Sequence, residues 1–116
     1  MGLGILLDQL GQLEIYKKML KQARIYIKGD VIGVGFRSWT KRKAKELEIK
    51  GWVRNVFVKP HIFGLRGGVE ALIQGEEENI NKMVEVLKKG PMTAVVNNID
   101  VMFEEIKDVF ETFEVV

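Results

Sequence analysis

The sequence predicts a single α+β domain in which two helices cover one face of an antiparallel sheet. Some segments are rich in alternating or β-branched apolar residues, which favours strands, and others repeat their apolar residues at helical spacing. Along the chain these segments follow in the order strand, helix, strand, strand, helix, strand. With 116 residues the chain is long enough for one domain with a hydrophobic core and too short for two.

An N-terminal extension, residues 1–22, precedes this domain, which we place at residues 23–116. Residues 3–21 are predicted to form an amphipathic helix, because leucines recur there mostly at spacings of three and four residues. The helix could pack on the domain's own core or join two copies of the chain. Asp8 interrupts the apolar start of the chain far short of a membrane span, so we expect no membrane segment and a cytoplasmic protein.

The first strand is predicted to start at Ala23, because the residues from Ala23 to Ile27 alternate between apolar and polar side chains. The glycine-rich run Gly29–Arg37 follows directly. A helix is then expected over residues 36–48, whose apolar positions repeat at helical spacing from Phe36 onward. We expect the Phe36 side chain in the core.

Further strands are predicted where aromatic and β-branched residues cluster: residues 52–58, 69–74, 95–103 and, as a short last strand, 113–116. A long apolar hairpin is expected to join the first two of these, and Trp52 is expected in the core. A helix over residues 76–89 has glutamates at its start and lysines at its end, as the helix dipole favours. This order predicts a ferredoxin-like sandwich (βαββαβ) plus the extra N-terminal helix.

The composition excludes several classes of site. There are 18 basic and 16 acidic residues, a formal net charge of +2, and the basic residues are spread along the chain, so we expect no nucleic-acid partner. No cysteine is present, which excludes disulfides, thiol catalysis and thiolate metal ligands. His61 is the one histidine and cannot form a histidine metal cluster alone. We therefore expect no metal and no cofactor.

The loop between the first strand and the first helix is a candidate anion site. Gly29, Gly33 and Gly35 would let backbone N–H groups turn inward, and the helix N-terminus adds partial positive charge. The Arg37 guanidinium can bind a phosphate or carboxylate through two parallel hydrogen bonds. Asp30 would repel an anion if it pointed inward, so we expect it to face solvent. The alternative is a glycine-rich turn with a surface arginine.

Two motifs resemble those of the acylphosphatase family, small enzymes that hydrolyse the carboxyl–phosphate bond of acyl phosphates. Residues Ile27–Arg37 resemble the family's phosphate loop, and Gly51–Asn55 resembles its second motif. The resemblance runs from about Ala23 to Val116. Two shorter matches lie where the family places strand and helix ends: Gly67–Val69 followed by Gly75, and Gly90–Pro91.

The resemblance implies a metal-independent enzyme acting on small acyl phosphates, with Arg37 and Asn55 as catalytic residues. Asn55 would orient the attacking water. Because an acyl phosphate is already activated, such a site needs charge stabilisation and a placed water rather than a metal or a covalent nucleophile. The resemblance also implies that the phosphate is bound by the Arg37 side chain and by backbone N–H groups of consecutive loop residues: Ile32, Gly33, Val34, Gly35, Phe36 and Arg37.

Three features depart from the family pattern. Ile32 stands where the family usually has glutamine, and Glu48 stands where it often has glycine at the end of the first helix. Residues 56–66 separate Asn55 from Gly67, a longer segment than is common in the family. Together with the N-terminal leucines, these residues leave an alternative open. The chain could be an inactive or redirected binding protein that forms homo-oligomers through the N-terminal helix or the long hairpin.

Overall fold

The computed structural model describes residues 11–12, 15–16 and 18–116. Most of the predicted N-terminal helix therefore lies outside the described residues. The strands are β1 (Leu20–Asp30), β2 (Lys50–Val56), β3 (Gly68–Glu76), β4 (Val95–Glu104) and β5 (Phe113–Val115). The helices are α2 (Phe36–Glu46), α3 (Pro60–Phe63) and α4 (Glu77–Lys89), and a 3₁₀ turn spans Gly64–Arg66. All the predicted strands and both core helices of the domain are present.

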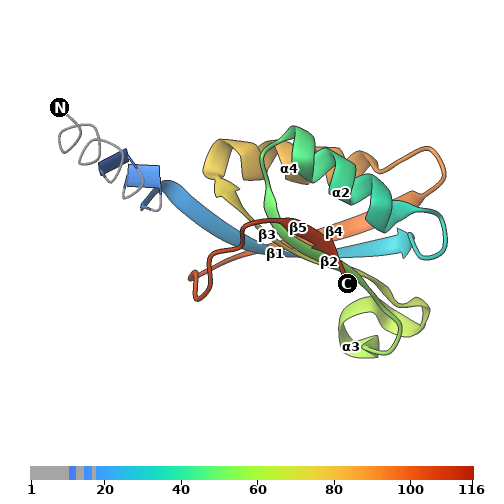
Figure 1. Ribbon diagram of the computed structural model, residues 1–116. Coiled ribbons are helices and arrows are strands. Elements are labelled where there is room, and N and C mark those ends of the chain that lie inside the picture. Colours follow the sequence, from blue (N-terminus) through green and yellow to red (C-terminus); the bar gives the residue numbers. More distant parts are fainter. Residues whose placement is uncertain (1–10, 13–14, 17) are drawn as a thin grey trace.

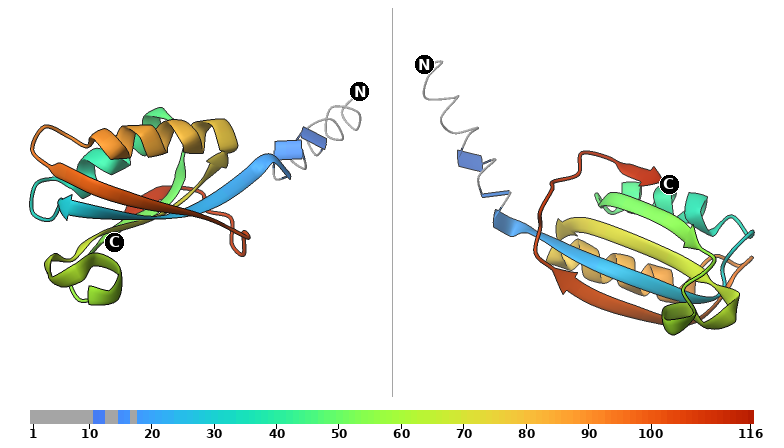
Figure 2. Two further views of the ribbon diagram at one scale, coloured as in Figure 1. Left: turned by 180° about the vertical axis from the view of Figure 1, so that it is seen from behind. Right: turned by 90° about the horizontal axis from the view of Figure 1, so that it is seen from below.

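The five strands form one sheet in the order β4-β1-β3-β2-β5. Helices α2 and α4 cover one face of this sheet, whereas α3 lies on the other side (Figures 1 and 2). This arrangement confirms the predicted ferredoxin-like fold. One correction concerns strand direction: β5 pairs parallel to β2, so the sheet is mixed rather than wholly antiparallel. The reason is that residues 105–112 carry the chain from the β4 edge to the opposite edge of the sheet.

Strand β1 begins at Leu20, three residues before the alternation at Ala23 predicts. Leu20 pairs with Glu76 of β3, and the Leu20 side chain is buried. Residues 20–22 were assigned to the extension because Leu20 continues the helical leucine spacing. Pairing with β3 outweighs that local preference, since each residue added to the strand also extends the hydrogen-bonded ladder.

The core lies between the sheet and the two helices. Ala23, Ile25 and Ile27 are fully buried on this side, as their alternation predicts, and Phe36 joins them as expected. Trp52 does not. It lies on the open face of the sheet, with the guanidinium carbons of Arg54 and Arg24 at 5.1 and 5.9 Å from its ring centroid.

Helix α2 ends in a cap that explains the departure at Glu48. The Ile49 N–H donates to the Ala44 carbonyl at 2.8 Å, and the Glu48 N–H donates to the Lys45 carbonyl at 3.3 Å. Together these bonds form a Schellman motif, in which the residue after the helix adopts a left-handed conformation. Glu48 does so, with a φ of 55°. A glutamate thus occupies a backbone position that favours glycine.

The connection between β2 and β3, residues 57–67, is helical rather than an extension of the hairpin. Strand β2 ends at Val56, two residues earlier than predicted, and Pro60 begins α3. Proline cannot donate to a strand ladder but is tolerated in the first turn of a helix. Phe63 is buried, and its ring packs edge-on against Tyr26 with the centroids 5.5 Å apart. The apolar residues that indicate strands in the sequence thus fold onto the open face of the sheet.

Candidate functional site

The glycine-rich loop lies between the end of β1 and the start of α2. Gly33 and Gly35 have φ values of 78° and 76°, a left-handed conformation that other residues adopt only with strain. Gly35 directly precedes α2 and has no side chain with which to cap the helix, and the first turn of α2 contains no acidic residue. The positive end of the helix dipole is therefore available to an external anion.

The backbone N–H groups of this loop are also available. Among the described residues, the backbone hydrogen bonds outside helices and strands include none donated by residues 32–35. The first bond of α2 runs from the Trp39 N–H to the Gly35 carbonyl at 3.1 Å. The preceding N–H groups of the first turn have no partner within the helix. A continuous run of donors is left for a ligand.

Arg37 and Asn55 line one small hollow of about 70 Å³. Arg37 is half-buried and makes no ion pair with any described residue. A cation near a helix N-terminus is unfavourable unless an anion lies beside it. The described lining contains no carboxylate and no histidine: Val31, Gly33, Gly35, Phe36, Arg37, Ser38 and Asn55. The structure thus brings the two predicted catalytic residues together in an environment suited to an anion.

Asn55 reaches this hollow from β2. It pairs with Val69 of β3, on the sheet face that the helices cover. Its side-chain oxygen Oδ1 is buried and has no hydrogen-bond partner among the residues that the structure describes. An unpaired buried acceptor costs on the order of 1–3 kcal/mol, so buried acceptors are normally satisfied by protein or water. A donor from outside the protein, such as a water molecule at the site, would satisfy this oxygen.

Five of the six predicted phosphate-binding residues, all except Arg37, lack a polar side chain and can contribute only their backbone. The Ile32 side chain lies against Gly67, where an added Cβ would come 3.3 Å from Ile32 Cδ1. The Val34 carbonyl accepts a hydrogen bond from Thr93 Oγ1 at 2.9 Å. Asp30 faces solvent as expected, and its Oδ1 lies 3.2 Å from Arg66 Nη1.

The hollow also contains two residues that sequence reasoning missed, Val31 and Ser38. Val31 is buried at the end of β1 and forms part of the apolar wall. Ser38 is exposed and lies in the first turn of α2, directly after Arg37. Its position one residue beyond a candidate anion-binding arginine at a helix start is the signal that could have identified it.

A second polar cluster, also missed, lies on the open face of the sheet. Glu70 is buried with 2% of its side chain exposed, and it binds both Arg24 and Arg54. Burial raises the pKa of Glu70, but hydrogen bonds from Arg54 and Arg24 outweigh this effect and bring the pKa below its ordinary value. Glu104 also binds Arg24, at 2.8 Å.

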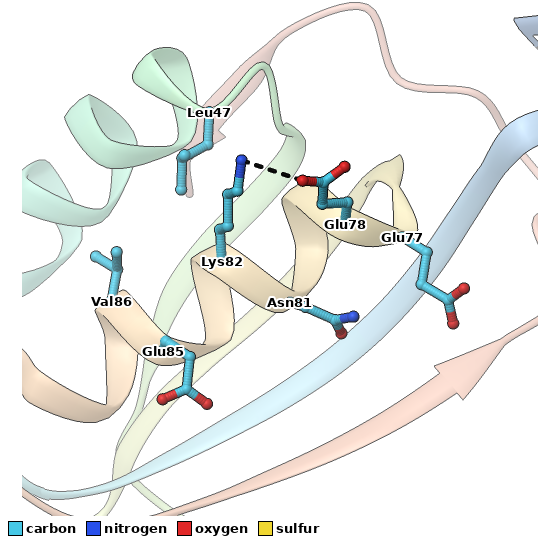
Figure 3. Close-up of a pocket in the computed structure, with 7 residues that line it drawn as sticks. All are labelled: Leu47, Glu77, Glu78, Asn81, Lys82, Glu85 and Val86. Carbon is cyan, nitrogen blue, oxygen red and sulfur yellow. Dashed lines mark ion pairs between the residues drawn. The ribbon is translucent and has the colours of Figure 1, made fainter.

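A larger hollow, of about 740 Å³, lies beside α4, with Leu47 after the end of α2 on its other side (Figure 3). Glu77, Glu78 and Glu85 line it, and among the described residues of the lining Lys82 is the one basic residue, paired with Glu78. This net negative lining would repel a phosphate.

In the part of the chain that the structure describes, no helix is long and apolar enough to cross a membrane.

The fold and the site define a ferredoxin-like α+β domain with a candidate anion site between its first strand and first helix. The Acylphosphatase family model matches residues 23–115. This chain belongs to the acylphosphatase family.

Individual relatives match this chain over most of their own length. The chain is 34% identical to an acylphosphatase of Syntrophus aciditrophicus over 97 residues, which are 84% of this chain and 93% of that one. It is 42% identical to an acylphosphatase of Archaeoglobus fulgidus over 91 residues, 78% of this chain and 92% of that one. The solved structure of an acylphosphatase from Coxiella burnetii matches with a TM-score of 0.73 and 31% identity, over 87% of this chain and 97% of that chain.

Proposed function

We propose that the protein hydrolyses acyl phosphates to a carboxylate and inorganic phosphate without a metal. The observation that carries this proposal is the unpartnered, buried Oδ1 of Asn55, which lines the same hollow as Arg37 and the glycine loop. Membership of the acylphosphatase family supports it. The alternative of an inactive or redirected binding protein is not favoured, because both candidate catalytic residues are present and adjacent to one hollow.

The substrate phosphate binds in the cradle through its non-bridging oxygens. The planar guanidinium of Arg37 donates two parallel hydrogen bonds, and the N–H groups of residues 32–37 donate the others. The N–H donors are fixed by the backbone conformation before the substrate arrives. They therefore stabilise the charge that builds up on the phosphate in the transition state without having to reorganise.

Asn55 positions the nucleophile. Its Oδ1 accepts a hydrogen bond from a water molecule, which directs a lone pair of that water toward the phosphorus. The new phosphorus–oxygen bond forms as the bond to the acyl carboxyl oxygen breaks, on the opposite side of the phosphorus. The electron pair of the broken bond leaves with the carboxylate, and the water's proton passes to a phosphate oxygen. The described lining offers no carboxylate or histidine as a base, and this route needs none.

The direct test is turnover of an aryl acyl phosphate by the full chain in the presence of a metal chelator. We expect carboxylate and inorganic phosphate to appear in equal amounts, and the Arg37→Ala variant to lose this activity while keeping its circular dichroism spectrum. Equal turnover by wild type and Arg37→Ala would contradict the proposal.

Self-association and location remain part of the proposal. Exposed apolar side chains in the connection, Phe57, Val58 and Leu65, support contact between copies, and the N-terminal helix is the second candidate. Light scattering on the full chain, with Leu65→Ser as the variant, tests the connection. A monomeric mass for the full chain would exclude self-association. Fractionation of cells that express the protein tests the cytoplasmic location.

A further inference from the structure

The part of β2 that carries Asn55 is held on one side only. Strand β5 pairs with β2 at Gly51–Val53 and goes no further, whereas β3 pairs with β2 as far as Val56. Asn55 therefore lies on an outer edge of the sheet, one residue from the end of its strand. The connection 57–67 follows directly. The ladder alone leaves the direction of this strand end weakly determined.

A side-chain clamp reinforces the strand at this point. Arg54 lies directly opposite Glu70 in the ladder, and its Nε and Nη2 lie 3.0 and 2.7 Å from Glu70 Oε1. The Arg54 guanidinium also lies over the Trp52 ring, 5.1 Å from the centroid. Because Glu70 is almost fully buried in the central strand β3, it is a rigid anchor.

We propose that Arg54 is a positioning residue for the reaction: its ion pair with Glu70 fixes the end of β2 so that Asn55 keeps its aim at the attacking water. Neighbouring residues of a strand point to opposite faces, so Arg54 lies on the open face and does not touch the substrate. It acts through the backbone of Asn55. This inference rests on the proposed function and adds the device that holds one of its two catalytic side chains.

The expected consequence is selective for the chemical step. The phosphate cradle belongs to the loop between β1 and α2, whereas Arg54 binds Glu70 on β3, so phosphate binding should be unaffected. A displacement of a catalytic group by about 1 Å can slow a reaction by about a hundredfold. A loosened strand end should therefore lower kcat and leave the affinity for phosphate unchanged.

Arg24 provides a matched control. It binds the other carboxylate oxygen of Glu70 and lies over the same Trp52 ring, but it is on β1. Each single substitution, Arg54→Ala or Arg24→Ala, leaves Glu70 with one arginine, so neither leaves a buried carboxylate unpaired. Arg24 also binds Glu104. Arg24→Ala should therefore be at least as destabilising as Arg54→Ala, which makes it a stringent comparison.

The experiment measures kcat, KM and inhibition by inorganic phosphate for the two variants and for Arg54→Lys. We expect Arg54→Ala to lower kcat by about tenfold or more with the phosphate inhibition constant within about twofold of wild type. Arg24→Ala should keep kcat within about twofold, and Arg54→Lys should recover part of the loss. Equal losses of kcat in the two alanine variants, or an unchanged kcat in Arg54→Ala, would overturn the inference.

A second measurement is independent of turnover. The side-chain amide signal of Asn55, assigned by its disappearance in Asn55→Ala, should shift or broaden in Arg54→Ala and stay in place in Arg24→Ala. If the wild type does not hydrolyse acyl phosphates, the proposed function fails and this signal still decides the positioning role. An Asn55 signal that is the same in Arg54→Ala and wild type would refute it.

Discussion

The two faces of the sheet differ in whether their polar side chains have partners within the protein. On the helix face, neither Arg37 nor the buried Oδ1 of Asn55 has a partner among the described residues: Arg37 makes no ion pair and Oδ1 accepts no hydrogen bond. On the open face, Arg24 and Arg54 share the buried carboxylate of Glu70. Polar groups left unpaired at a cost in stability indicate a ligand site, whereas fully paired ones indicate a structural role.

The ion-paired cluster on the open face joins strands that lead to the hollow on the helix face. Glu70 is on the central strand β3, and its two arginines are on the neighbouring strands β1 and β2. Strand β1 leads into the glycine loop, and β2 carries Asn55. The polar cluster on the open face therefore ties together the two strands that bring the glycine loop and Asn55 to one hollow. Substitutions on the helix face should therefore act mainly on activity and those on the open face mainly on stability, with Arg54 as the exception because we propose that it holds the strand end that carries Asn55.

The largest expected effect is on activity, from Arg37→Ala. Removing one preorganised donor to a developing oxyanion typically costs about 10²–10³ in kcat, and Arg37 supplies two donors and a charge. Because Arg37 makes no ion pair with a described residue, the midpoint of thermal unfolding should stay close to that of wild type. Arg42→Ala, on the exposed side of the same helix, is the control and should keep full activity. A similar loss in both variants would remove the distinction between the two faces.

Asn55→Ala should lower kcat by about a hundredfold, because the attacking water loses its orientation. Inhibition by inorganic phosphate should change little. Since the side-chain oxygen has no hydrogen-bond partner in the described part of the chain, the free energy of unfolding should be unchanged or slightly higher. Steady-state kinetics and urea unfolding measure the two quantities, with the exposed Asn97→Ala as control. A clear loss of stability in Asn55→Ala would assign the side chain a structural role.

On the open face, Glu70→Gln should lower the free energy of unfolding by about 2 kcal/mol at pH 7, with the charge-assisted hydrogen bonds as the source. The pKa of folded Glu70 lies below its ordinary value, which is near 4.5. The carboxylate therefore contributes its stability above about pH 4.5, and this contribution is lost as the pH falls through the folded pKa. The difference between wild type and Glu70→Gln should shrink on acidification. Glu85→Gln, an exposed partner of Lys88, should cost well under 1 kcal/mol at any pH. A difference that stays constant down to pH 3 would contradict this account.

Local patterns were sufficient to predict most of the fold. The alternation from Ala23 to Ile27 and the helical spacing after Phe36 reflect which face each element buries. These elements could therefore be predicted from the sequence. The parallel pairing of β5 with β2 was not predictable, because it depends on where residues 105–112 carry the chain. The helical form of the connection was also missed, since apolar residues such as Phe63 suit a strand or a buried turn equally well.

Some features of the candidate site were likewise predictable from the sequence, and others were not. The motifs around Arg37 and Asn55 predicted that both lie near one cradle, and the structure brings them to one hollow. The cluster around Glu70 was not predicted, because it depends on Arg24 and Arg54 from two different strands. No local pattern carries that information. The unpartnered oxygen of Asn55 likewise becomes visible once the surrounding atoms are placed.

The smallest expected effect is a gain in stability away from both faces. Glu48 holds a left-handed conformation with a φ of 55° at the end of α2. Glycine adopts this conformation without the contact that strains other residues, although it loses more backbone entropy on folding. Glu48→Gly should therefore raise the free energy of unfolding by about 0.5–1 kcal/mol and leave kcat unchanged.

The same chemical change two residues earlier provides the control. Glu46 is the last residue of α2, where glycine lacks the helix propensity of glutamate, so Glu46→Gly should lower stability by up to about 1 kcal/mol. Urea unfolding of both variants measures whether each substitution raises or lowers the free energy of unfolding. A loss of stability in Glu48→Gly would mean that the glutamate side chain contributes more at this cap than its backbone conformation costs. In that case the departure from the family's glycine would be an adaptation of this chain rather than a tolerated strain.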